Sequence, residues 1–182
     1  MTEELIIAGF GGQGVLSMGK ILAYSGIMDS KEVTWFPSYG PEMRGGTANV
    51  TVIISDHRIS SPVLHEYDTA IILNQQSMDK FEKDVKPGGV LIYDPNGITH
   101  APTRTDIDIY KVEGTVTAVE MGNPRIFNMI IVGGYLKIKP IVSLDHVEKG
   151  LQKSLPARYH NLIPLNLEAI RKGQEIVEKV MV

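Results

Sequence analysis

The strongest constraint on the fold lies near the start of the chain, where an apolar run leads directly into a glycine-rich segment. Residues 5–8 read Leu-Ile-Ile-Ala, and four of the six residues at 9–14 are glycine. The spacing matches the G-x-G-x-x-G fingerprint, with a predicted strand before it and a predicted helix after it. Glycine lets the backbone turn sharply and leaves amide groups uncovered at the positive end of the helix. We therefore predict an α/β fold whose first loop accepts an anion, or another backbone, at close range.

The next strand argues against a bound dinucleotide. In dinucleotide-binding folds an acidic residue about 20 positions after the loop, at the end of the second strand, holds the ribose hydroxyls. The predicted second strand, residues 33–36, ends in Pro37 and Ser38 without a carboxylate, and Asp29 and Glu32 flank its start. A self-contained NAD- or FAD-binding oxidoreductase of Rossmann type is therefore kept as the alternative function.

Composition narrows the class of protein further. The 182 residues suffice for one substantial domain, residues 1–182, with 43% hydrophobic and 21% charged residues and a formal net charge of −3. No basic excess points to nucleic acid, no apolar stretch approaches the length of a membrane span, and the N-terminus lacks the basic region of a signal peptide. We expect a cytoplasmic protein that binds neither nucleic acid nor membrane.

The chain contains no cysteine, so it has no thiolate to ligate an iron–sulfur cluster. Any redox centre must therefore lie on another chain. The five histidines are scattered without metal-ligand spacing, and no Ser/His/Asp or paired-carboxylate arrangement is visible. We expect no metal, no bound cofactor and no catalytic residue in this chain alone.

A second glycine-rich segment interrupts the alternation of strands and helices. Residues 38–46 contain three glycines, a proline, a tyrosine and an Arg–Glu pair. A loop that only connects two elements does not need an aromatic residue and an Arg–Glu pair. A loop that presents its backbone and an arginine to a partner does need them. The alternative is that Glu42 and Arg44 pair locally and the glycines only make turns.

The rest of the chain predicts a three-layer sandwich, in which a Rossmann-like, mostly parallel sheet carries helices on both faces. Residues 47–54 alternate like a strand, and a polar turn at 55–58 suggests a hairpin, which leaves a mixed sheet open. Gly133 and Gly134, inside an apolar helix, indicate that the sheet or another chain approaches closely. Further strands are expected at 68–74, 90–93 and 106–112, and helices at 75–81, 115–121, 125–136, 143–152 and 166–180.

Three segments are expected at one edge of this sheet. Ligands and partners of parallel sheets lie at the carboxyl ends of the strands. That rule places residues 9–14, residues 38–46 and Asn74 together. Asn74 fits equally well as the N-cap of the helix that follows it.

Taken together, the two glycine motifs resemble those of one family. Gly-Phe-Gly-Gly-Gln-Gly-Val at 9–15, followed by Ser-Tyr-Gly-Pro-Glu-Met-Arg-Gly-Gly at 38–46, is similar to the gamma subunit, or gamma domain, of the 2-oxoacid:ferredoxin oxidoreductases. The resemblance continues through residues 59–62, 68–74 and 166–173, and so spans essentially the whole chain.

This resemblance implies a noncatalytic partner of alpha and beta subunits, with a delta subunit left open. In the assembled enzyme those subunits use thiamine diphosphate, Mg²⁺ and an iron–sulfur cluster to decarboxylate a 2-oxoacid, pass the acyl group to coenzyme A and send electrons to ferredoxin. The separate chain without cysteine favours a 2-oxoglutarate enzyme, and pyruvate and branched-chain acids stay open. We expect the isolated chain to be inactive and to self-associate through its partner-facing surface.

Carried onto this sequence, the resemblance implies two loops that face the partner subunits near the thiamine site. Together with Asn74, the candidate residues are Gly11, Gly12, Gln13, Gly14, Ser38, Tyr39, Gly40, Pro41, Glu42, Arg44, Gly45 and Gly46.

Arg44 is the strongest single candidate, because its planar donor fork suits a carboxylate or a coenzyme A phosphate at a buried contact. We expect Arg44→Ala to weaken assembly or turnover, since losing one partner of such a contact costs about 2–5 kcal/mol. Copurification with the partner subunits and the activity of the complex measure this effect. Normal copurification together with normal activity would remove the proposed role.

Overall fold

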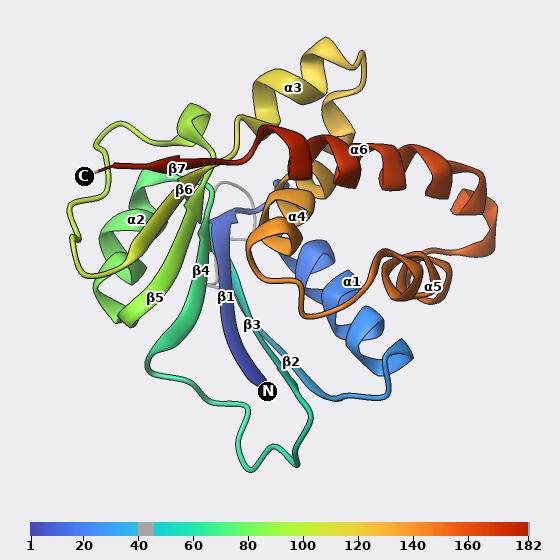
Figure 1. The fold of residues 1–182 in the computed structure, drawn as a ribbon. Coiled ribbons are helices and arrows are strands. Elements are labelled where there is room, and N and C mark those ends of the chain that lie inside the picture. The colour runs from blue at the N-terminus through green and yellow to red at the C-terminus, as the bar shows by residue number, and fades with distance from the viewer. Residues whose placement is uncertain (40–45, 182) are drawn as a thin grey trace.

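The computed structural model describes residues 1–39 and 46–181, and within them the chain forms an α/β sandwich around a seven-stranded mixed sheet (Figure 1). The sheet order is β2-β3-β1-β4-β5-β6-β7. The strands are β1 (Thr2–Phe10), β2 (Glu32–Tyr39), β3 (Thr47–Ser55), β4 (Tyr67–Ile72), β5 (Val85–Tyr93), β6 (Asp108–Lys111) and β7 (Glu178–Val180). The α-helices are α1 (Val15–Met28), α2 (Gln75–Phe81), α3 (Gly114–Glu120), α4 (Phe127–Ile138), α5 (Leu144–Ser154) and α6 (Ile163–Ile176).

The centre of the sheet is parallel and both flanks contain an antiparallel strand. β1, β4, β5 and β6 pair in parallel, whereas β3 is antiparallel to both β1 and β2, and β7 is antiparallel to β6. Because β3 lies between β1 and β2, these two strands point the same way. The expected mixed, mostly parallel sheet is confirmed, and the carboxyl ends of β1, β2, β4, β5 and β6 share the upper edge in Figure 1.

Helices cover both faces of the sheet, which confirms the expected three layers. Leu5 and Ile7 belong to the larger core beneath α1, α4, α5 and α6, whereas Ile6 and Ala8 belong to a smaller core beneath α2. Successive side chains of a strand point to opposite faces, so a strand covered on both sides is apolar throughout. Within the described part of the chain, no helix has the length and apolar character needed to cross a bilayer.

Two helices pack so closely that glycine is required between them. A Cβ atom on Gly133 would overlap the carbonyl of Ile170 in α6, and one on Gly173 would overlap the carbonyl of Ile130 in α4. Gly134 lies against the Val112 side chain after β6. The close approach expected at residues 133–134 is therefore made by this chain's own α6 and Val112.

Two sequence-based expectations about the elements were wrong. The predicted hairpin turn at 55–58 does not form, because β3 pairs with β2 and β1, and the chain then runs irregularly to β4. The last helix was expected at 166–180, but α6 ends at Ile176 and β7 follows. Val180 pairs with Ile109 of β6, so the last residues satisfy the backbone groups of an otherwise open sheet edge.

A buried carboxylate lies at the opposite, amino edge of the sheet. Glu3 is 5% exposed; its Oε1 accepts a hydrogen bond from Thr69 Oγ1 at 2.5 Å, and its Oε2 lies 3.6 Å from Lys139 Nζ. The Tyr135 hydroxyl donates to the same carboxylate at 3.5 Å. Burial disfavours the charged form and raises the pKa of Glu3 above its ordinary value of 4.5.

This carboxylate predicts a pH dependence of stability. Because the folded state binds the Glu3 proton more tightly than the unfolded state, the wild-type free energy of unfolding falls as pH rises from the unfolded-state pKa through the raised one. Glu3→Gln keeps an acceptor for Thr69 and removes the titration, so the variant should gain stability relative to wild type between about pH 4 and pH 7. Denaturant unfolding at both pH values measures this, with the exposed Glu168→Gln as control. A difference between variant and wild type that does not change with pH would contradict the assignment.

The close α4–α6 contact predicts that Gly→Ala lowers the free energy of unfolding here, the opposite of its usual effect in a helix. In an open helix position Gly→Ala stabilises by about 1 kcal/mol. Gly173→Ala should instead lower the free energy of unfolding by about 1–3 kcal/mol, because the new Cβ overlaps a backbone carbonyl. Glu168→Ala on the exposed face of α6 should change it by less than about 0.5 kcal/mol. Stabilisation by Gly173→Ala would show that the two helices are not this close.

Candidate functional site

The loop between β1 and α1 has a backbone that only glycine adopts readily. Gly12 and Gly14 have φ values of 97° and 76°. Space is also limiting at Gly14, where a Cβ atom would lie 2.7 Å from Asn128 Nδ2 at the start of α4. Around Gly12, by contrast, no atom lies within 4 Å of such a Cβ position. The loop is therefore held against α4 at one end and exposes bare backbone at its tip.

The Gln13 side chain makes two hydrogen bonds that hold this loop in shape. Its Oε1 accepts a hydrogen bond from the backbone N–H of Phe10 at 2.6 Å, and its Nε2 donates to the carbonyl of Leu73 at 3.2 Å. Gly9 makes room for this arrangement, since a Cβ there would lie 2.5 Å from Gln13 Oε1. Gln13 thus ties the loop to the residue that follows β4 and holds the loop in shape.

The two glycine motifs meet at the carboxyl edge of the sheet. The backbone N–H of Gly11 donates to the carbonyl of Gly46 at 3.0 Å. Ser38, exposed near the end of β2, pairs with Asn49 of β3. The structure therefore brings the described ends of the second motif, Ser38 and Gly46, to the edge where the first motif lies.

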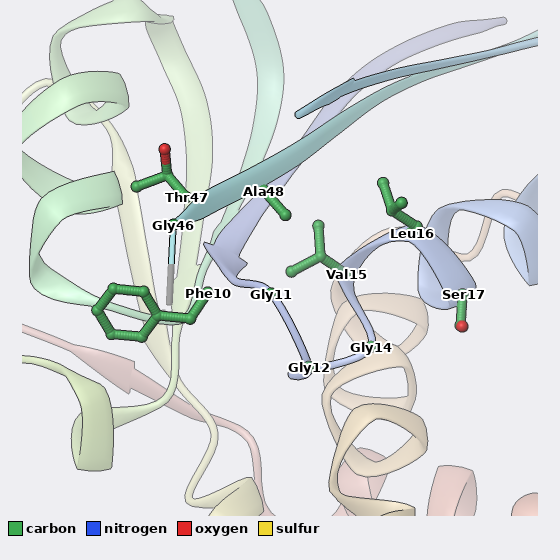
Figure 2. Close-up of a pocket in the computed structure, with 10 residues that line it drawn as sticks. All are labelled: Phe10, Gly11, Gly12, Gly14, Val15, Leu16, Ser17, Gly46, Thr47 and Ala48. Carbon is green, nitrogen blue, oxygen red and sulfur yellow. The ribbon is translucent and has the colours of Figure 1, made fainter. Parts of the chain in front are cut away.

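A hollow of about 380 Å³ opens between this loop, the start of α1 and the start of β3 (Figure 2). Figure 2 shows the Val15 and Ala48 side chains facing each other across it. No described residue that lines it is charged, and no side chain among the described residues caps α1. The lining residues are Phe10, Gly11, Gly12, Gly14, Val15, Leu16, Ser17, Gly46, Thr47 and Ala48.

This lining limits what the hollow can do chemically. The first amide groups of a helix have no intrahelical acceptor, so an incoming carbonyl, carboxylate or phosphate oxygen can bind them. Glycine and aliphatic side chains can receive an apolar group of a partner. The described lining contains no group that could transfer a proton at neutral pH. The hollow is suited to binding and positioning.

The sheet order also explains why the dinucleotide alternative finds no support here. In a dinucleotide-binding fold the ribose-binding acid comes from the end of the parallel strand beside the first one. In this chain the neighbour of β1 is the antiparallel β3. It begins at this edge with Thr47 and Ala48, directly after Gly46. Glu32 begins β2 at the opposite edge.

Asn74 is the N-cap of α2. Its Oδ1 accepts a hydrogen bond from the backbone N–H of Ser77 at 2.8 Å, and the residue is 1% exposed. Of the two roles that its sequence position allowed, the structure shows the capping role.

The remaining candidate residues of the second motif lie at and after the end of β2. Tyr39 ends β2, but its side chain lies outside the described part of the structure. Gly40, Pro41, Glu42, Arg44 and Gly45 also lie outside the described residues, and their roles stay predictions.

Sequence reasoning missed exposed apolar side chains at this edge. Phe10, at the end of β1, is 36% exposed. Val116 and Val119 of α3 are 46% and 60% exposed, and α3 follows the carboxyl end of β6 at the top of Figure 1. The buried carboxylate of Asp94 holds α3 there, because it accepts hydrogen bonds from the Thr115 N–H and hydroxyl. No local sequence signal separates these valines from core valines.

The residues that the structure describes contain no group of three or more His, Cys, Asp and Glu side chains that could hold a metal ion. The described part of the site therefore consists of shaped backbone, helix-terminal amides, apolar side chains and the hydroxyls of Ser17 and Thr47.

Comparison with known proteins gives a consistent family. The family model of pyruvate ferredoxin/flavodoxin oxidoreductase matches residues 4–176. The 2-oxoglutarate synthase subunit KorC of Methanocaldococcus jannaschii is 34% identical over 183 residues, which cover 99% of this chain and 96% of that protein. The ketoisovalerate oxidoreductase subunit VorA of Methanothermobacter thermautotrophicus is also 34% identical, over 93% of this chain but 35% of its own length.

A solved structure agrees with these sequence relatives. The gamma subunit of a keto/oxoacid ferredoxin oxidoreductase from Geobacter sulfurreducens superposes with a TM-score of 0.82 at 29% identity, and the match covers 97% of this chain and 96% of that one. The resemblance inferred from the two glycine motifs is confirmed: the chain belongs to the pyruvate ferredoxin/flavodoxin oxidoreductase family, as a gamma-type subunit.

Proposed function

We propose that this gamma-type subunit supports assembly and the surroundings of the active site in a 2-oxoacid:ferredoxin oxidoreductase, with the chemistry carried by other subunits. The observation that carries the proposal is the hydrogen bond between Gly11 and Gly46, which brings the first motif and the described end of the second together at one edge, here called the rim (residues 9–14 and Gly46). A rim of bare backbone beside apolar side chains can approach another polypeptide closely. Its described lining contains no charged side chain and no His, Cys or Tyr, and its only side-chain polar groups are the hydroxyls of Ser17 and Thr47.

The proposed partners are the alpha and beta subunits of the same enzyme, with a delta subunit left open and ferredoxin reached through the complex. They would hold thiamine diphosphate, Mg²⁺, the iron–sulfur cluster and coenzyme A. The absence of cysteine from the whole sequence supports this division, because a cluster needs thiolate ligands. One 182-residue domain and a cytoplasmic location remain the expected setting.

For the substrate we propose 2-oxoglutarate. The support is the KorC relative, which matches along nearly the full length of both chains. VorA is equally similar in sequence, but this chain matches about a third of it. The chain architecture therefore favours the 2-oxoglutarate enzyme over the branched-chain one.

The Gln13 contact supplies the test. In Gln13→Glu a carboxylate replaces the amide that donates to the Leu73 carbonyl, so two acceptors face each other and the loop detaches. Leaving such groups unpaired costs about 1–3 kcal/mol, which should weaken binding to the alpha and beta subunits by about 5- to 150-fold. Titration of labelled chain with those subunits measures the affinity, and ferredoxin reduction with 2-oxoglutarate and coenzyme A measures turnover.

Gln76→Glu is the matched control, because Gln76 is exposed on α2. It should leave affinity and turnover unchanged. Hydrogen exchange at residues 10–14 shows whether the loop has opened in each variant. An opened loop with wild-type affinity and turnover would contradict the proposed role of this rim, and a wild-type chain that binds neither subunit would contradict the proposed function as a whole.

A further inference from the structure

A second exposed apolar surface runs along α1 and the edge strand β2. It is a groove of about 360 Å³ lined by Lys20, Ala23, Tyr24, Ile27, Val33 and Trp35, here called the α1–β2 groove. Ile27 is 50% exposed and Trp35, the only tryptophan of the chain, is 39% exposed. Neither exposed side chain is needed to complete the core described above.

The groove has a fixed shape. The Trp35 indole N–H donates to the carbonyl of Leu16 at 3.3 Å, so the ring is tied to the first turns of α1. Gly19 makes room for this ring, since a Cβ there would lie 3.2 Å from the indole nitrogen. An exposed aromatic held in one orientation loses little entropy when a partner covers it, which is typical of anchor residues in interfaces.

The position of β2 adds a second reason for a covering partner. β2 is the last strand on its side of the sheet, so one row of its backbone groups has no partner strand. Phe36, on the face opposite Trp35, is 46% exposed. An exposed apolar edge strand can pair with another chain unless something covers it or removes its N–H donors. Among the described residues of β2 only Pro37 lacks an N–H, so the other described residues keep their donors.

The groove is continuous with the rim at residues 9–14 and Gly46. Leu16 lines the hollow at the carboxyl edge and accepts the hydrogen bond from Trp35. From there the exposed residues of α1 continue through Lys20 to Ile27. β2 itself leads into the second glycine motif. A partner seated on the rim therefore meets the groove without crossing an unrelated surface.

We propose that the α1–β2 groove is a second docking surface, and that its occupant is an apolar segment with an acidic side chain from the neighbouring subunit of the same oxidoreductase. The proposal rests on the proposed function. It follows from charge, because Lys20 is the one charged residue among the described lining and makes no ion pair with any described residue. The VorA relative supports a partner from the same enzyme, because the segment that matches this chain is there about a third of a longer polypeptide.

The single tryptophan allows a direct test. The chain is labelled with 5-fluorotryptophan, so that the only fluorine reports on Trp35, and is titrated with unlabelled alpha and beta subunits. The ¹⁹F resonance should shift and lose its solvent isotope effect as the complex forms. A resonance unchanged in a complex that has formed would overturn the proposal and leave the proposed function standing. A shift that follows the chain's own concentration, and not that of the subunits, would assign the groove to a second copy and would also overturn it.

Substitutions test the same surface independently. Ile27→Asp should weaken binding to the subunits by about tenfold or more, and Ile27→Ala should weaken it in the same direction. Val63→Asp is the matched control, because Val63 is 55% exposed in the loop between β3 and β4, away from the groove. Equal affinity of wild type, Ile27→Asp and Val63→Asp would overturn the groove assignment. Absence of binding by the wild type itself would overturn the proposed function instead.

Discussion

The structure depends on one topological constraint, the placement of the antiparallel β3 between β1 and β2. It carries Gly46 to the first loop, where the carbonyl accepts the hydrogen bond from Gly11, and so joins two motifs that are far apart in the sequence. The same strand occupies the position from which a parallel neighbour would supply a ribose-binding carboxylate. The antiparallel direction of β3 therefore brings Gly46 to the first loop, and it leaves no parallel neighbour of β1 on that side to supply the ribose-binding carboxylate.

Much of the fold could be predicted from the sequence because its signals are local. The strand–loop–helix unit at the start, the apolar strand β4 and the Asn74 cap follow from periodicity, glycine spacing and capping chemistry. The end of α6 could not be predicted. Leu167, Ile170 and Val177 continue a helical pattern, and the chain leaves the helix because β6 offers an unpaired edge that is distant in sequence.

The candidate site shows the same division. The sequence predicted that the glycine motifs share one edge, since both follow strands that point the same way. It could not predict that Gln13 would point inward, because its acceptor at Leu73 is brought near by the pairing of β1 with β4. The α1–β2 groove was missed for a similar reason. Trp35 reads as an ordinary strand residue, and its exposure follows from the edge position of β2.

The central claim is that bare backbone at the carboxyl edge exists to contact another polypeptide. A cryo-EM structure of this chain in complex with its alpha and beta subunits tests that claim most directly. The account predicts that residues 9–14 and the start of β3 lie against a neighbouring subunit, with no dinucleotide in the hollow between them. A complex in which this edge faces solvent, or in which a nucleotide fills the hollow, would contradict it.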